Sequence, residues 1–164
     1  MKLKEAHNEF IGAWGSLGSS WGVNRTMAQI HALLLVSIEP LSAEDIMEKL
    51  NISRGNVNMN VRTLIDWGLA DKRFVTGERK EFFVAGKDVW GMAKQVARER
   101  KKRELEPLQR TLEKLKLDKV NTPEEKEFQS LVKELGQFAD SADGLLGKFI
   151  NSKKNWIFKL ASKL

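Results

Sequence analysis

Residues 41–69 read LSAEDIMEKLNISRGNVNMNVRTLIDWGL, and this stretch decides the fold. Ser42 is placed to cap a helix that carries an acid at Asp45 and apolar residues behind it. Asn51 tolerates the left-handed conformation that closes a helix, and Ser53 can cap the helix that follows. Two capped helices joined by about three residues predict a helix-turn-helix.

The second helix of this pair has two different faces. Its apolar residues recur at helical spacing and are expected to point into the core; they are Val57, Val61, Leu64 and Ile65. The opposite flank is polar, and there we place Arg54, Asn58 and Arg62, with Asn56, Asn60 and Thr63 beside them. Asparagine is a poor helix former, so this concentration beside two arginines indicates a functional surface.

A basic hairpin is predicted directly after Gly68. Residues 69–75 (LADKRFV) and 80–85 (KEFFVA) alternate as strands do, and Gly77 supplies the turn between them. The hairpin carries Lys72, Arg73, Arg79 and Lys80. A helix-turn-helix followed by such a hairpin is a winged helix, so the fold class is mainly α with a small β-hairpin wing.

Helices are expected on both sides of this domain. They cover residues 3–18 and 24–36, a long segment capped by Asp88 and bent near Pro107, and a last segment that opens with a capping box at Thr122. Their apolar stripes exceed what a small winged helix can cover, which predicts a homodimer. The residues expected at the dimer contact are Phe10, Trp14, Leu17, Leu105, Leu108, Leu112, Leu131, Leu135 and Phe138.

The chain therefore divides into three regions in this prediction. Residues 1–22 form an N-terminal dimerisation helix, residues 23–87 the winged helix-turn-helix, and residues 88–164 a C-terminal helical dimerisation region.

Composition narrows the function classes. The chain has 164 residues, a net charge of +6, a pI near 9.5 and no cysteine. It shows neither a signal peptide nor an apolar run of membrane-spanning length, so we expect a soluble cytoplasmic protein. The two histidines, His7 and His31, lack metal-binding spacing, and no serine lies in a G-x-S-x-G motif. We expect no enzyme activity, no metal and no cofactor.

Positive charge gathers in two segments. Residues 94–103 contain six bases and one acid, and residues 147–164 contain five lysines and no acid. Such clusters favour polyanions, although a solvated helix face has the same composition. The tail segment KKNWIFKL (153–160) is basic and apolar together, which suits either a membrane surface or the dimer core; we favour the dimer core.

Several phrases of the sequence resemble a known family. They are NRTMAQIHALLLVS, LSAEDIMEKLNISRGNVNMNVRTLIDWGL, the TGERKEFF wing and DVWGMAKQVARERKKRELEPL. They are similar to winged-helix transcription regulators of the MarR superfamily, most closely its GbsR-like branch. The resemblance covers roughly residues 10–108. It implies a homodimer on a pseudo-palindromic operator, with one helix in the major groove and the wing at the neighbouring backbone or minor groove.

The polar flank then acquires a chemical role. Arginine can donate two hydrogen bonds to guanine and asparagine can bridge adenine, so Arg54 and Asn58 are the expected base contacts. Backbone or base contacts are expected from Ser53, Asn56, Asn60, Arg62 and Thr63, and phosphate or minor-groove contacts from Arg73, Arg79 and Lys80. The predicted function is a sequence-specific transcriptional regulator, acting as a repressor. The alternative is a winged-helix adaptor that binds proteins instead of DNA.

The tryptophans leave one further question open. Trp14, Trp21, Trp67, Trp90 and Trp156 either pack at the junction of the DNA-binding and dimerisation regions or form an aromatic cage for a small effector, such as a quaternary ammonium compound. GbsR-like proteins are linked to osmoprotectant metabolism and some sense choline, which is what the resemblance adds to this alternative. Packing is the favoured role.

Overall fold

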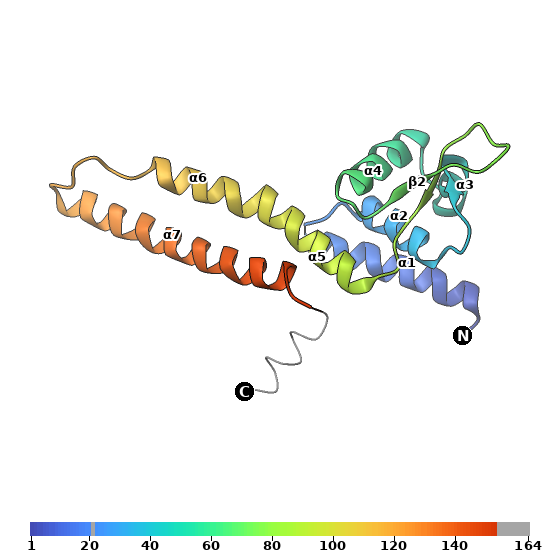
Figure 1. Cartoon of the computed structure of the whole chain (residues 1–164), viewed down its shortest axis with the longest axis horizontal. Helices are drawn as coiled ribbons and strands as arrows, with labels where there is room; N and C mark the ends of the chain where they lie inside the picture. Colours follow the sequence, from blue (N-terminus) through green and yellow to red (C-terminus); the bar gives the residue numbers. More distant parts are fainter. Residues whose placement is uncertain (21, 154–164) are drawn as a thin grey trace. The chain divides into compact units, whose positions relative to one another are not determined.

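The computed structural model describes residues 1–20 and 22–153, and these divide into two compact units with the boundary between Met92 and Ala93. The first unit contains α1 (Leu3–Ser20), α2 (Arg25–Val36), α3 (Ala43–Leu50) and α4 (Arg54–Asp66) together with three short strands. It ends in the first turn of α5 (Val89–Arg100; Figure 1). Asp88 caps this helix as predicted, because its Oδ1 accepts a hydrogen bond from the Trp90 amide at 3.1 Å.

Helices α1 and α2 pack closely because α1 is rich in glycine. A Cβ atom at Gly18 would lie only 2.6 Å from the Cβ of Ala28, and one at Gly15 would lie 2.6 Å from the Cγ of Gln29. The small residues thus let the α2 backbone approach α1.

The core of the first unit lies where α2, α3 and α4 meet. Ile30, Ile46, Val57, Val61 and Leu64 have almost no exposed surface. Four of these five come from the helix-turn-helix and its inward stripe, so packing of the two capped helices against α2 fixes the orientation of α4.

The wing is a three-stranded antiparallel sheet in the order β1-β3-β2. Strands β2 (Asp71–Arg73) and β3 (Phe82–Val84) form the predicted hairpin, but they are shorter than expected and leave residues 74–81 as its loop. The prediction missed β1 (Leu41–Ser42), which pairs Leu41 with Phe83 and joins the wing to the start of α3.

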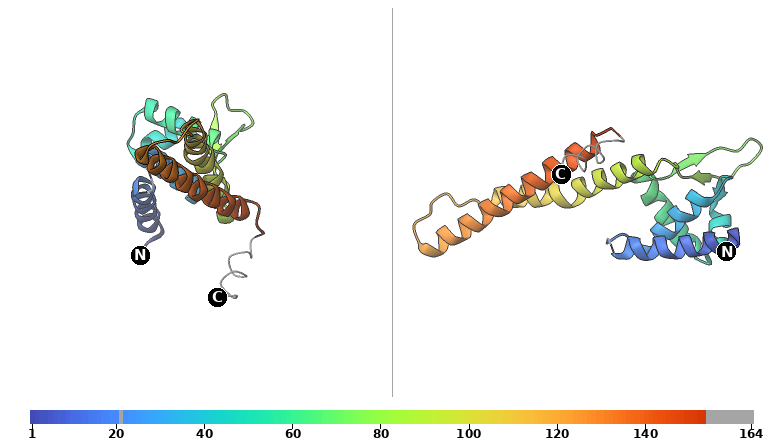
Figure 2. Two further views of the ribbon diagram at one scale, coloured as in Figure 1. Left: turned by 90° about the vertical axis from the view of Figure 1, so that its left-hand side faces the viewer. Right: turned by 90° about the horizontal axis from the view of Figure 1, so that it is seen from below.

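The second unit is a helical hairpin. The rest of α5 continues through a π-helical turn, η1 (Lys101–Leu105), into α6 (Glu106–Lys114), and α7 (Pro123–Ile150) returns antiparallel beside α6 (Figure 2). Pro107 has no amide hydrogen for a regular helical bond, which accounts for the irregular turn just before it and fits the predicted bend.

Within this hairpin, Leu112 packs with Val132 and Ala139 of α7, and Leu105 lies against them. The predicted capping box of Thr122 and Glu125 opens α7. No helix among the described residues is both long and apolar enough to cross a membrane.

Candidate nucleic-acid interface

Local capping holds the helix-turn-helix in place. Ser42 and Asp45 form a reciprocal capping box, with the Ser42 amide 2.8 Å from Asp45 Oδ2, and these hydrogen bonds hold the pKa of Asp45 below its usual value. Asn51 adopts the left-handed conformation with φ 51°, and the Ser53 hydroxyl accepts a bond from the Asn56 amide. The three caps read from the sequence are therefore confirmed.

The outward flank of α4, defined as Arg54, Asn58 and Arg62, is exposed as expected. Asn56 is also exposed in the first turn. Thr63 is half-buried, and its hydroxyl donates to the Met59 carbonyl at 3.0 Å. Two guanidinium groups and one amide therefore stand in a row along the surface of α4.

Asn60 does not belong to this surface, so its predicted DNA contact is wrong. The residue is only 3% exposed, and its side-chain amide donates to the Asn56 carbonyl at 2.8 Å. Helical periodicity explains this position, because Asn60 lies three residues after Val57 and four before Leu64, on the inward face. The hydrogen bond to Asn56 satisfies the buried amide.

Arg54 has an acidic partner that the sequence did not reveal. Its Nη2 donates to Glu44 Oε1 at 2.7 Å, from the start of α4 to the start of α3. The pKa of Glu44 is lowered by a backbone hydrogen bond, by this contact and by the nearby charges of Arg54 and Lys80. Both side chains remain about half exposed, and exposed ion pairs exchange readily for other partners.

The wing carries exposed cations in its loop and at the adjoining end of β2. Arg73, Arg79 and Lys80 are all exposed, and the Lys80 ammonium lies 5.7 Å from the centre of the Phe82 ring. Lys72 of β2 instead pairs with Glu81, the last residue of the hairpin loop, at 2.6 Å. The positive surface of the wing therefore depends on Arg73, Arg79 and Lys80.

Met59 is an exposed residue of α4 that sequence reasoning passed over. It is 58% exposed and lies on the side of α4 opposite the core. The same 3.6-residue period that buries Asn60 points Met59 outward, so the signal was present and the apolar residue type concealed it.

The residues expected at a dimer contact differ in how exposed they are. The exposed ones lie in both units, and they are Leu17, Leu108, Leu131, Leu135 and Phe138. Phe10 and Trp14 are half-buried and stack with ring centres 5.4 Å apart. Leu112 is buried inside its own hairpin, so its predicted intermolecular contact is wrong, and Leu105 packs beside it.

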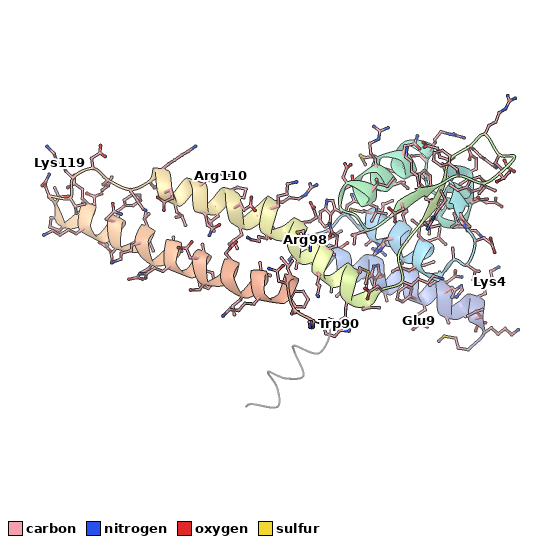
Figure 3. The ribbon with its side chains drawn as sticks, viewed as in Figure 1. Lys4, Glu9, Trp90, Arg98, Arg110 and Lys119 are labelled. Atoms are coloured by element: carbon pink, nitrogen blue, oxygen red, sulfur yellow. The ribbon has the colours of Figure 1, made fainter. Side chains whose placement is uncertain are left out.

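The basic segment 94–103 largely pairs within the chain. Arg103 lies 3.2 Å from Glu99, Arg100 lies 3.7 Å from Glu104, and Lys101 lies 3.0 Å from Asp143 of α7. Figure 3 places Arg98 on α5, where it donates to Gln95. These contacts favour a structural role for most of the cluster, in place of the polyanion site that composition suggested.

The tryptophan cage stays untested. Trp14 lies beside Phe10 and beside His31, whose ring centre is 6.4 Å away. Burial lowers the pKa of His31 to about 4, so this imidazole is neutral at pH 7. Trp21, Trp156 and most of the basic tail segment fall outside the described residues.

Comparison with known proteins supports this geometry. Residues 21–81 match the model of the MarR family. No curated protein sequence matches the chain. A solved structure described as the crystal structure of a transcriptional regulator has a TM-score of 0.55 and 21% identity, over 87% of this chain and 99% of that one. The chain thus has the winged helix-turn-helix fold, and its residues 21–81 are similar to the MarR family.

Proposed function

We propose that this protein is a sequence-specific regulator of transcription that binds double-stranded DNA. The observation that carries the proposal is the outward flank of α4, where Arg54, Asn58 and Arg62 stand exposed in a domain that matches the MarR family. An α-helix fits the major groove of B-DNA, and the N-terminal residues of such a helix meet the base edges.

The chemistry of each side chain assigns its task. Arg54 donates to the two acceptors of a guanine, and Asn58 bridges the donor and acceptor of an adenine. Ser53, Asn56 and Arg62 bind the adjoining phosphates or bases, and Thr63 contributes at the edge of the interface. Arg73, Arg79 and Lys80 hold the backbone or minor groove beside α4, which fixes the register of the domain on the duplex.

The regulator acts as a homodimer on a pseudo-palindromic operator. Support comes from α7, whose exposed apolar side chains include Leu131, Leu135 and a 72% exposed Phe138. Such a stripe on a soluble helix is stabilised when it packs against another helix. Two copies related by a twofold axis place their α4 helices about 34 Å apart, one turn of the double helix. Binding over a promoter then represses transcription by excluding the polymerase.

The effector belongs to the same proposal. Some GbsR-like proteins sense choline, so the resemblance to this branch supports a quaternary ammonium ligand. Aromatic rings attract such cations. Trp14, with Phe10 beside it, is the ring pair that supports this assignment. Saturable quenching of tryptophan fluorescence by choline or betaine is expected; a flat titration at millimolar concentrations would remove this part of the proposal.

The test of the main proposal is binding of the full chain to DNA from upstream of its own gene. We expect a twofold-symmetric footprint and an affinity that falls steeply as salt rises. The charge control is Lys119→Ala, in the loop between α6 and α7 (Figure 3), which removes one cation outside the interface and should leave the salt dependence unchanged. Absence of saturable binding at low salt would contradict the proposal.

A further inference from the structure

We propose that Met59 reads the C5 methyl group of a thymine, which makes it a specificity-determining residue of α4. The inference rests on the proposed DNA-binding function and adds a base contact that the polar residues do not supply. It starts from an exposed apolar side chain in the middle of a polar surface.

Met59 is the one large apolar side chain exposed on α4, all of whose residues the structure describes. It lies one residue after Asn58 and three before Arg62, so it is flanked by the two groups assigned to base edges and backbone. The unbranched thioether is flexible and polarisable, and it adapts to small apolar surfaces. On a helix that enters the major groove, this side chain is placed at the depth of the bases.

Gly55 supports this placement independently. It occupies the same strip of α4, four residues before Met59, and a Cβ atom there would meet only the Ser53 hydroxyl, at 4.0 Å. No crowding within the described residues therefore requires glycine, although glycine weakens a helix relative to alanine. Because Gly55 has no Cβ atom, another molecule can come close to α4 at this position. A molecule that does so also reaches Met59, one turn further along the same strip.

The chemistry of the groove selects the partner of Met59. The major-groove edges of the bases present donors and acceptors, and the C5 methyl group of thymine is their apolar feature. Burying one methyl group against a hydrocarbon contributes about fourfold in affinity, which corresponds to ~0.8 kcal/mol. A twofold-symmetric operator has two such contacts, so removing both should weaken binding about fifteenfold if the contributions add.

The experiment uses the full chain and an operator obtained by selection from random duplexes. Each thymine of the half-site is replaced in turn by deoxyuridine, in both half-sites, which removes only the methyl group. Fluorescence anisotropy measures binding by the wild type, Met59→Ala, Met59→Leu and Ile38→Ala. Ile38 is the matched control, because it is 89% exposed in the same unit and lies outside α4. Circular dichroism checks that each variant is folded.

We expect one thymine position at which the wild type and Ile38→Ala lose about fifteenfold on demethylation, whereas Met59→Ala binds both duplexes equally. Met59→Leu should keep most of the difference, because it retains an apolar side chain. The inference is overturned if the wild type binds every deoxyuridine duplex as it binds the thymine duplex, or if Met59→Ala keeps the full loss. Either result leaves the DNA-binding proposal standing, whereas a wild type that binds no duplex removes both.

Discussion

Replacing Phe138 by lysine should weaken self-association of the chain without unfolding it. Phe138 is 72% exposed on α7, so its ring contributes little to the fold of one chain. In a homodimer that covers this stripe, the ring leaves water, and lysine at the same position brings a charge into the contact. The variant therefore separates the proposed dimer from the stability of the helical hairpin.

The magnitude follows from the exposed part of the ring. Full burial of a phenylalanine side chain contributes about 1.5–3 kcal/mol. Phe138 is 72% exposed in one chain, so burying this exposed part in a dimer contributes roughly 1–2 kcal/mol per copy. A symmetric dimer buries two copies, which gives about 2–4 kcal/mol and raises the dimer Kd roughly 30- to 900-fold. Desolvation of the introduced ammonium adds to this loss.

Sedimentation equilibrium over a range of chain concentrations measures the effect. Gln137→Lys is the matched control, since it adds the same charge at the neighbouring exposed position, about 100° away around the helix. The far-ultraviolet circular dichroism of both variants should equal that of the wild type. A wild type that stays monomeric at every concentration, or equal weakening by the two substitutions, would refute the reasoning.

The remaining predictions test the interface and the first unit. Arg54→Ala should cost about 1–3 kcal/mol on the operator and relax its sequence preference, whereas Lys80→Ala should weaken all duplexes alike and reduce the salt slope by about one; equal effects on operator and random DNA would contradict the Arg54 assignment. As pH falls from 6.5 to about 4, the unfolded chain protonates His31 while the folded chain does not. Urea titrations should therefore show that the free energy of unfolding of the wild type falls by about 3 kcal/mol over this range because of His31. The His31→Leu variant should not show this loss. Parallel pH profiles would exclude this burial effect. Gly18→Ala should destabilise by about 1–3 kcal/mol because its Cβ meets Ala28, and Gly12→Ala, with open space around it, should stabilise by about 0.5–1 kcal/mol; urea midpoints that move together would contradict the packing.

Local chemistry explains why the helix-turn-helix was predictable from the sequence. Ser42, Asn51 and Ser53 each act on backbone groups within a few residues, so residue type and spacing are sufficient to place the caps. Strand β1 depends on pairing between Leu41 and Phe83, which are far apart in the chain. A two-residue strand leaves no periodic pattern, and no local signal could reveal it.

Polarity misled the assignment of the α4 surface at two positions. Residue polarity alone puts Asn60 on the outward surface and gives no reason to put Met59 there, yet helical geometry buries Asn60 and exposes Met59. The predicted dimer contact of Leu112 is wrong for a related reason. A three-four spacing states which residues share a face, but it does not say whether that face meets the same chain or another copy.

Glu44 changes how the contribution of Arg54 to DNA binding is to be understood. The guanidinium of the free protein already has a carboxylate partner, so a base contact replaces the bond to Glu44 and does not start from a fully hydrated cation. Because the pair is exposed, water and salt screen it, and the exchange requires little rearrangement. A guanine offers two acceptors to the fork of Arg54, whereas Glu44 engages one nitrogen in this structure. Under the proposed function we therefore expect the exchange to be favourable where a guanine is present and nearly neutral elsewhere, so that Arg54 stays with Glu44 on mismatched DNA and contributes little to non-specific binding.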